Sequence, residues 1–93
     1  TEETLPVRYA LEQNYPNPFN PTTTIRYALP NQSNVKLVIY NVLGQAVSEL
    51  VNEEQPAGMF KATWDAAKMP SGVYFYRLNA GEFVETKKMV LMR

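Results

Sequence analysis

The side chains that most often carry out catalysis are nearly absent from this chain of 93 residues. It contains no histidine and no cysteine, so the common nucleophile–base pairs and the soft ligands of transition metals are missing. Glu53 and Glu54 are adjacent, and neighbours in sequence rarely aim at one substrate atom. Asp65, which follows Trp64, is interpreted as a hydrogen-bond acceptor in a turn or at a cap, with a ligand-binding role as the alternative. We therefore predict that the protein is not an enzyme and needs no cofactor or metal.

The charges balance, with nine basic and nine acidic residues, and this gives no electrostatic footprint for nucleic acid. They are distributed unevenly, because three basic and six acidic residues precede Gln55, and six basic and three acidic residues lie from Gln55 onward. The basic part includes Lys87, Lys88 and Arg93. Two interpretations remain open, either ordinary solvated faces or attraction of a partner to the last strand.

The elements that position these side chains are predicted to be β-strands, because apolar residues alternate with polar ones along most of the chain. Loops are expected at residues 52–58 and 65–72, the second with room for one helical turn. About seven strands with turns at roughly 8–12-residue spacing are typical of an all-β, immunoglobulin-like antiparallel β-sandwich. The strand ranges read from the sequence are 24–29, 35–40, 46–51, 59–64, 73–79 and 83–92.

The inward-facing residues of these strands predict one core. Residues 73–78 are apolar on both faces, which indicates a central strand or one whose outer face meets something else. The aromatic residues allow two interpretations, a sugar-stacking platform formed by Trp64 with the strip from Tyr74 to Tyr76, or core packing of Trp64 and alternate members of that strip. The residues expected to be buried together are Ile25, Leu37, Ile39, Trp64 and Leu78.

A proline-rich segment, residues 14–21, follows an expected linker at residues 1–10 and opens a domain predicted to span residues 11–93. Proline has no amide donor and restricts the residue before it, so this segment is neither helix nor central strand. We expect a rigid, ordered loop with Tyr15 and Phe19 turned inward and asparagine side chains bonded to local backbone.

Four segments together resemble a known family. They are Asn-Tyr-Pro-Asn-Pro-Phe-Asn-Pro-Thr-Thr-Thr-Ile at 14–25, Val-Lys-Leu-Val-Ile-Tyr-Asn-Val-Leu-Gly-Gln-Ala-Val at 35–47, Ser-Gly-Val-Tyr-Phe-Tyr-Arg-Leu at 71–78, and the lysine pair with its apolar tail at 86–93. The chain is similar to the type A C-terminal sorting domains of the type IX secretion system and to the immunoglobulin-like module of the flagellar hook-cap protein. The resemblance covers about residues 11–93.

This resemblance implies a non-catalytic domain that directs a larger exported bacterial protein through the periplasm and the outer membrane to the cell surface. The implied partners are an outer-membrane secretion translocon, a sortase-like peptidase and an upstream cargo domain of the same polypeptide. The positions that match the family motifs are Pro16, Asn17, Pro18, Gly44, Gly72 and Tyr74. The positions expected to contact a partner are Lys87, Lys88, Met89 and Val90.

The lysine pair carries most of the expectation of partner recognition. In a regular strand Lys87 and Lys88 point to opposite faces, so one of them must face inward, or lie at a bulge or a sheet margin. A solvated edge that discourages aggregation is the other interpretation of the pair.

Two further function classes stay open. One is a structural or assembly module, such as a surface anchor, spacer or filament subunit, with self-association through strand edges. The other is a carbohydrate-binding accessory module of a secreted hydrolase.

Overall fold

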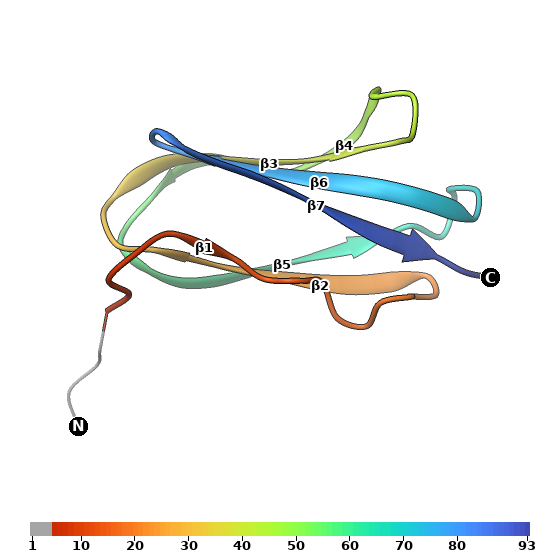
Figure 1. The fold of residues 1–93 in the computed structure, drawn as a ribbon, viewed down its shortest axis with the longest axis horizontal. Coiled ribbons are helices and arrows are strands. Elements are labelled where there is room, and N and C mark those ends of the chain that lie inside the picture. The colour runs from red at the N-terminus through yellow and green to blue at the C-terminus, as the bar shows by residue number, and fades with distance from the viewer. Residues whose placement is uncertain (1–4) are drawn as a thin grey trace.

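The computed structural model describes residues 5–93, which form seven β-strands. None of the described residues belongs to a helix long and apolar enough to cross a membrane. The strands lie in two layers with the core between them (Figure 1). All pairings between strands are antiparallel, and this confirms the predicted immunoglobulin-like sandwich. The strand bounds are β1 Ala10–Leu11, β2 Thr22–Leu29, β3 Ser33–Tyr40, β4 Ala46–Gln55, β5 Gly58–Asp65, β6 Gly72–Ala80 and β7 Phe83–Leu91.

The order of strands determines which of them is available to a partner. One sheet has the order β1-β2-β5 and the other has the order β4-β3-β6-β7. β6 is therefore the central strand that its apolar sequence predicted, with β3 on one side and β7 on the other. β7 lies at the edge of its sheet, and an edge strand has one side that its own sheet does not pair.

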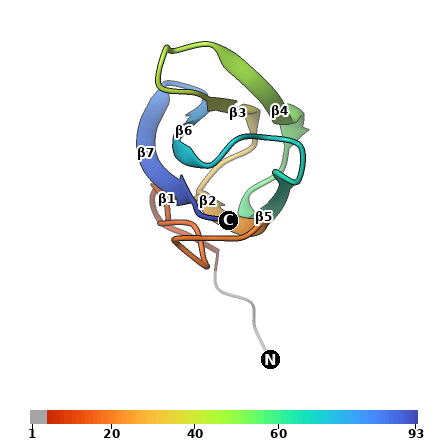
Figure 2. The ribbon, with the colours of Figure 1, turned by 90° about the vertical axis from the view of Figure 1, so that its right-hand side faces the viewer.

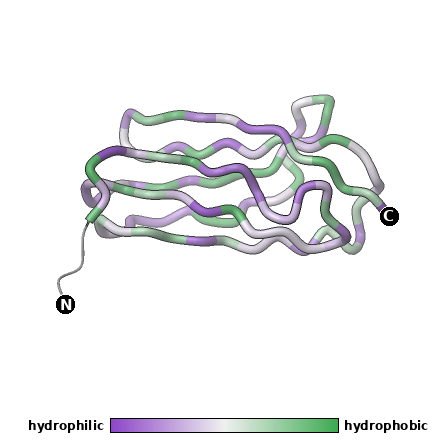
Figure 3. The backbone as a smooth tube through the Cα atoms, turned by 60° about the horizontal axis from the view of Figure 1, so that its bottom comes forward, coloured by the Kyte–Doolittle hydropathy of each residue, from purple (hydrophilic) through white to green (hydrophobic). Residues whose placement is uncertain are grey.

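Hydrophobic and hydrophilic residues alternate along the strands, as the colours in Figure 3 show. Because successive side chains of a strand point to opposite faces, this alternation sorts them between core and solvent. In β2, Ile25, Tyr27 and Leu29 are buried, whereas Arg26 between them is exposed. The sequence therefore predicted the packing as well as the strands. All the predicted core residues belong to one buried cluster: Ile25, Leu37, Ile39, Trp64 and Leu78.

The aromatic residues are used mainly for core packing. The ring of Trp64 lies with its centroid 5.3 Å from that of Tyr74 in an edge-to-face arrangement, and 5.8 Å from that of Phe19. Tyr76 is also fully buried. None of these rings has a free face for stacking on a sugar, and in the strip only Phe75 is partly exposed.

Residues 52–58 differ from the predicted polar loop. β4 continues to Gln55, and its residues pair with β3 up to that point, for example Glu53 with Val35. β4 is an edge strand, so its polar side chains remain solvated and the strand needs no apolar alternation there. The hydroxyl of Tyr27 donates to Oε1 of Gln55 at 2.7 Å and fixes the end of the strand.

The expected linker is only partly within the structure, because residues 1–4 lie outside the described residues. Tyr9 already packs on the sandwich. Its ring stacks on Phe83 with centroids 5.2 Å apart, and its hydroxyl lies 3.0 Å from Oγ of Ser33. Ala10 begins β1, a strand too short to show a pattern in the sequence. The domain boundary after residue 10 stays a prediction.

Candidate partner-recognition site

The proline loop, residues 14–21, lies directly against the end of β7 (Figure 2). The N–H of Phe19 donates to the carbonyl of Val90 at 2.9 Å, and the N–H of Met92 donates to the carbonyl of Phe19 at 3.0 Å. Asn17 adds a side-chain contact, because its Oδ1 accepts from the N–H of Val90 at 3.0 Å. The opening motif and the last strand, 73 positions apart at this contact, therefore form one surface.

Asn14, which is buried, holds the loop from inside. Its Nδ2 donates to Oγ1 of Thr23 at 2.9 Å and to the carbonyl of Pro16 at 3.1 Å. Oγ1 of Thr23 in turn donates to the same carbonyl at 2.8 Å. The peptide bonds that precede Pro16, Pro18 and Pro21 are cis. This closed network satisfies the buried polar groups, and it confirms the expected ordered loop with asparagine bonded to local backbone.

The two aromatic residues of the loop point in opposite directions. Phe19 is buried, as predicted, whereas Tyr15, also predicted to turn inward, is 75% exposed. The backbone of Tyr15 forms a β-bridge with Thr24, with N···O distances of 2.9 and 3.0 Å. Residues opposite each other on paired strands project to the same face, and Thr24 projects outward. The prediction for Tyr15 is therefore wrong, and its ring is accessible to a partner.

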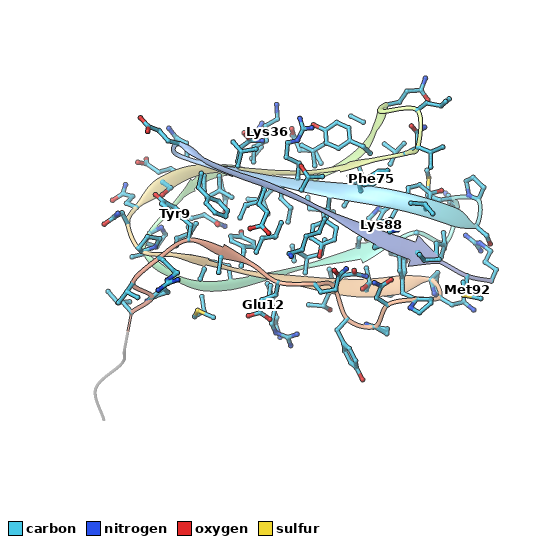
Figure 4. All side chains as sticks on the ribbon, viewed as in Figure 1. Tyr9, Glu12, Lys36, Phe75, Lys88 and Met92 are labelled. Atoms are coloured by element: carbon cyan, nitrogen blue, oxygen red, sulfur yellow. The ribbon has the colours of Figure 1, made fainter. Side chains whose placement is uncertain are left out.

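Lys87 and Lys88 point to opposite faces of β7, as a regular strand requires. Lys88 is exposed on the outer face of the sheet, directly opposite Phe75 on β6 (Figure 4). Lys87 lies at the inner margin of the sheet with its side chain 28% exposed, and its Nζ is 3.3 Å from the carboxylate of Glu85. The inward lysine is paired and close to solvent, so its placement costs little.

Only two of the four residues expected to contact a partner have side chains on that outer face. They are Lys88 and the half-buried Val90. Met89 lies in the core with no exposed area, so it stabilises β7 by packing and cannot touch a partner of the folded domain. Lys87 presents its ammonium group at the sheet margin.

The free side of β7 has a covered part and an open part. In the covered part the proline loop takes both backbone groups of Val90, and Nε2 of Gln13 donates to the carbonyl of Lys88 at 2.7 Å. Alternate residues of an antiparallel pair direct their N–H and C=O groups away from the neighbouring strand. Val84 and Thr86 direct their backbone N–H and C=O groups to the open side of β7. Within residues 5–93, β7 pairs with no strand besides β6.

Gly44, like Gly72 with its φ of +147°, is a motif position whose backbone requires glycine. Its φ is +80°, a conformation that residues with a Cβ adopt only with strain. The same turn is fixed by Asn41, whose Oδ1 accepts from the N–H of Leu43 at 2.9 Å and from the N–H of Gln45 at 3.0 Å. The turn is therefore a rigid tip at the end of the β3–β4 hairpin.

Tyr74 and Gly72, at the other matched motif, also have structural roles. Tyr74 is buried, and its hydroxyl donates to the carbonyl of Pro70 at 2.6 Å. Gly72 begins β6 opposite Leu91 of β7. These positions order the turn before β6, which lies beside the end of β7.

Arg93, which the sequence indicated only as part of the basic end, joins the end of the chain to the turn after β5. Its Nη2, with two N–H donors, lies 2.6 Å from each of the carbonyl oxygens of Ala66, Ala67 and Met69, which share these donors. Oδ1 of Asp65 accepts from the N–H of Ala67 at 3.0 Å in the same turn, which confirms its interpretation as a turn acceptor. No sequence motif could predict the contacts of Arg93, because its partners are backbone carbonyls, which every residue has.

Tyr76 connects β6 to the segment that leads into the proline loop. Its hydroxyl accepts from the N–H of Asn14 at 2.8 Å and donates to the carbonyl of Glu12 at 2.7 Å. Burial raises the pKa of Tyr76 to about 12, and the nearby Glu85 carboxylate acts in the same direction. A tyrosine that points inward from a central strand needs a hydrogen-bond partner for its buried hydroxyl. The sequence could therefore have indicated that Tyr76 forms such a contact, although not with which residues.

The surface provides contacts for binding. Within residues 5–93 no group of three or more acidic side chains gathers to hold a metal ion. The features found at β7 are an exposed lysine and an open strand edge, whereas the exposed ring of Tyr15 projects with Thr24 from the outer face of the other sheet. Such groups recognise another polypeptide by charge and by backbone pairing.

Comparison with known proteins identifies the family. A profile of the secretion system C-terminal sorting domain matches residues 13–92, most of the 93-residue chain. The chain therefore belongs to this family, which confirms the resemblance to type IX sorting domains seen in the sequence. A search of curated proteins gives no match. Membership marks the protein for export across the outer membrane, to the cell surface or beyond it.

Proposed function

We propose that the outer-membrane translocon of the type IX system recognises this domain in its folded state, through the proline loop and the outer side of β7. A role as a secretion signal follows from the family. One observation supports this location above all others. The loop is hydrogen-bonded to Val90 and Met92, so the opening motif and the last strand form one continuous surface.

Three kinds of contact are available on this surface. Lys88 is exposed on the outer face of the four-stranded sheet and can meet a complementary patch on the translocon. The backbone groups of Val84 and Thr86 can pair with an extended segment of the partner. Lys87 contributes charge at the sheet margin, where Glu85 holds it.

The placement of the two ends of the domain fits attachment to cargo. The chain enters the sandwich at one end, and the proline loop and the end of β7 lie at the other (Figure 1). An upstream domain of the same polypeptide therefore leaves the proline loop and the end of β7 uncovered, whereas Val84 lies near the entry, next to the Phe83 on which Tyr9 stacks. A sortase-like peptidase that acts on the connection would work at the entry end, away from the translocon contacts.

The test is export of a reporter that carries its own signal peptide and is fused to residues 1–93, in a bacterium with the type IX machinery. Exchanging both Lys87 and Lys88 for glutamate should retain the reporter in the periplasm. Lys61→Glu is the matched control, because Lys61 is an exposed strand lysine of the other sheet. Deleting residues 86–93 is a poor test, because it removes Met89 and Leu91 from the core.

Folding of each variant is checked by the emission of Trp64, which is buried. A folded double variant that reaches the cell surface at the normal level would show that the lysine pair is a solvated edge and that the proposed recognition is wrong.

A further inference from the structure

A shallow groove lies on the outer face of the four-stranded sheet, beside the β3–β4 hairpin tip. Its floor is formed by Tyr40 and Phe75, which are directly opposite each other on β3 and β6. Its walls are Val42 from the hairpin tip, and Arg77 with Thr86. Phe75 is only partly buried (Figure 4), so the groove offers apolar surface to a ligand.

Arg77 is held in position at the wall of the groove. Its guanidinium carbon lies 5.2 Å from the centroid of the Tyr40 ring, and its Nε donates to Oγ1 of Thr86 at 3.2 Å. Within residues 5–93 its two terminal nitrogens donate no hydrogen bond and meet no carboxylate. A fixed guanidinium with free terminal donors matches the geometry of a carboxylate.

Of the described residues that line the groove, Arg77 is the one that is charged. No acidic residue lines it. Lys88, directly opposite Phe75 on the outer face, adds a second positive charge. On the other side of β3, Glu49 is already 3.9 Å from Nζ of Lys36 and so is paired. The groove is therefore complementary to a ligand that carries a negative charge beside an apolar group.

We propose that this groove binds a short acidic peptide segment of a partner protein. An aspartate or glutamate carboxylate of that segment contacts the terminal nitrogens of Arg77, and a neighbouring apolar side chain packs on Phe75 beside Val42. The hairpin tip extends the apolar surface, because Val42 and Leu43 are 67% and 79% exposed. The hairpin tip beside the groove lies at the end of the sandwich opposite the chain entry (Figure 1), so an upstream domain leaves it open. Thr86 and Lys88 also belong to the surface proposed for the translocon, so the acidic segment and the translocon would meet at this part of β7.

The test is a titration of the isotope-labelled 93-residue chain with N-acetyl-Leu-Asp-Gly amide, followed by backbone amide chemical shifts. Saturable shifts are expected at Phe75, Arg77 and Thr86, with a dissociation constant of the order of millimolar for so small a ligand. Replacing the aspartate of the peptide by asparagine, or its leucine by alanine, should each weaken binding about fivefold.

The matched variants are Arg77→Gln and, as a control, Lys61→Gln, each checked for an unchanged fold by the dispersion of its amide spectrum. Arg77→Gln should weaken binding about tenfold, and Lys61→Gln should not change it. Equal binding of the aspartate and asparagine peptides, or unchanged binding by folded Arg77→Gln, would overturn the proposal. Shifts at Phe75 caused by cellohexaose and not by the acidic peptide would also overturn it, because the occupant would then be a glycan. No translocon is present in this assay, so its failure is distinct from failure of export.

Discussion

Removing one buried hydroxyl group, by Tyr76→Phe, should loosen the segment that leads into the proline loop. The hydroxyl of Tyr76 accepts from the N–H of Asn14 at 2.8 Å and donates to the carbonyl of Glu12 at 2.7 Å. Phenylalanine keeps the ring in the core but leaves both backbone groups without this partner. The variant therefore tests hydrogen bonding almost without changing packing.

The expected magnitude follows from the burial of the two groups. A buried donor or acceptor left without a partner costs about 1–3 kcal/mol. The bond to Asn14 is buried, whereas the bond to Glu12 is only partly buried, so water can replace the tyrosine at that carbonyl. The free energy of unfolding should therefore fall by about 2 kcal/mol, and for a domain of this size Tm should fall by about 10 °C.

Urea unfolding followed by the emission of Trp64, the single tryptophan, measures this loss. Tyr15→Phe is the matched control, since it removes the same atom from a ring that is 75% exposed, and its stability should stay within about 0.5 kcal/mol of the parent. Hydrogen exchange should also become about tenfold faster at the amide of Asn14 in Tyr76→Phe. Equal stabilities of the two variants would refute the assignment of Tyr76 as the anchor of this segment.

Two further predictions concern pH and backbone conformation. Burial raises the pKa of Tyr76 from 10.0 to about 12, so the folded state favours the neutral hydroxyl, and its contribution is complete below about pH 10 and lost as the pH rises towards 12. The drop in unfolding free energy over that interval, measured by urea titration at each pH, should be smaller in Tyr76→Phe than in the parent. Gly44→Ala should cost about 1 kcal/mol in the same assay, because φ is +80° and a Cβ there meets no atom within 4 Å, which leaves backbone strain as the only effect. An unchanged stability of Gly44→Ala would contradict the fixed turn geometry.

The strands and the core could be predicted because they depend on local alternation. In β2 and β3 every second residue is apolar, and Ile25, Leu37 and Ile39 are fully buried as expected. The same rule placed Lys87 and Lys88 on opposite faces. It failed for residues 52–55, which extend β4 although they are polar, because an edge strand needs no apolar alternation.

The candidate site was predicted less completely, because its contacts join residues far apart in the chain. Pairing of Asn17 with Val90 and of Arg93 with the carbonyls after β5 leaves no pattern in neighbouring residues. The prediction that Tyr15 turns inward was wrong for a related reason. The β-bridge to Thr24 sets the direction of its side chain, and a loop has no periodic pattern from which that direction could be predicted. Met89 looked accessible near the end of the chain, yet it completes the core.

The hydrogen bonds between the proline loop and β7 set an order of events during synthesis. The ribosome makes Asn17 long before Val90, its partner 73 positions later, and the loop has nothing to dock on until the last strand has emerged. Met92 must emerge too, because its N–H completes the attachment of Phe19. A chain interrupted before that point lacks this surface, whatever precedes it. A translocon that binds this surface would therefore export polypeptides that have been translated through Met92, and it would not bind polypeptides truncated before that residue.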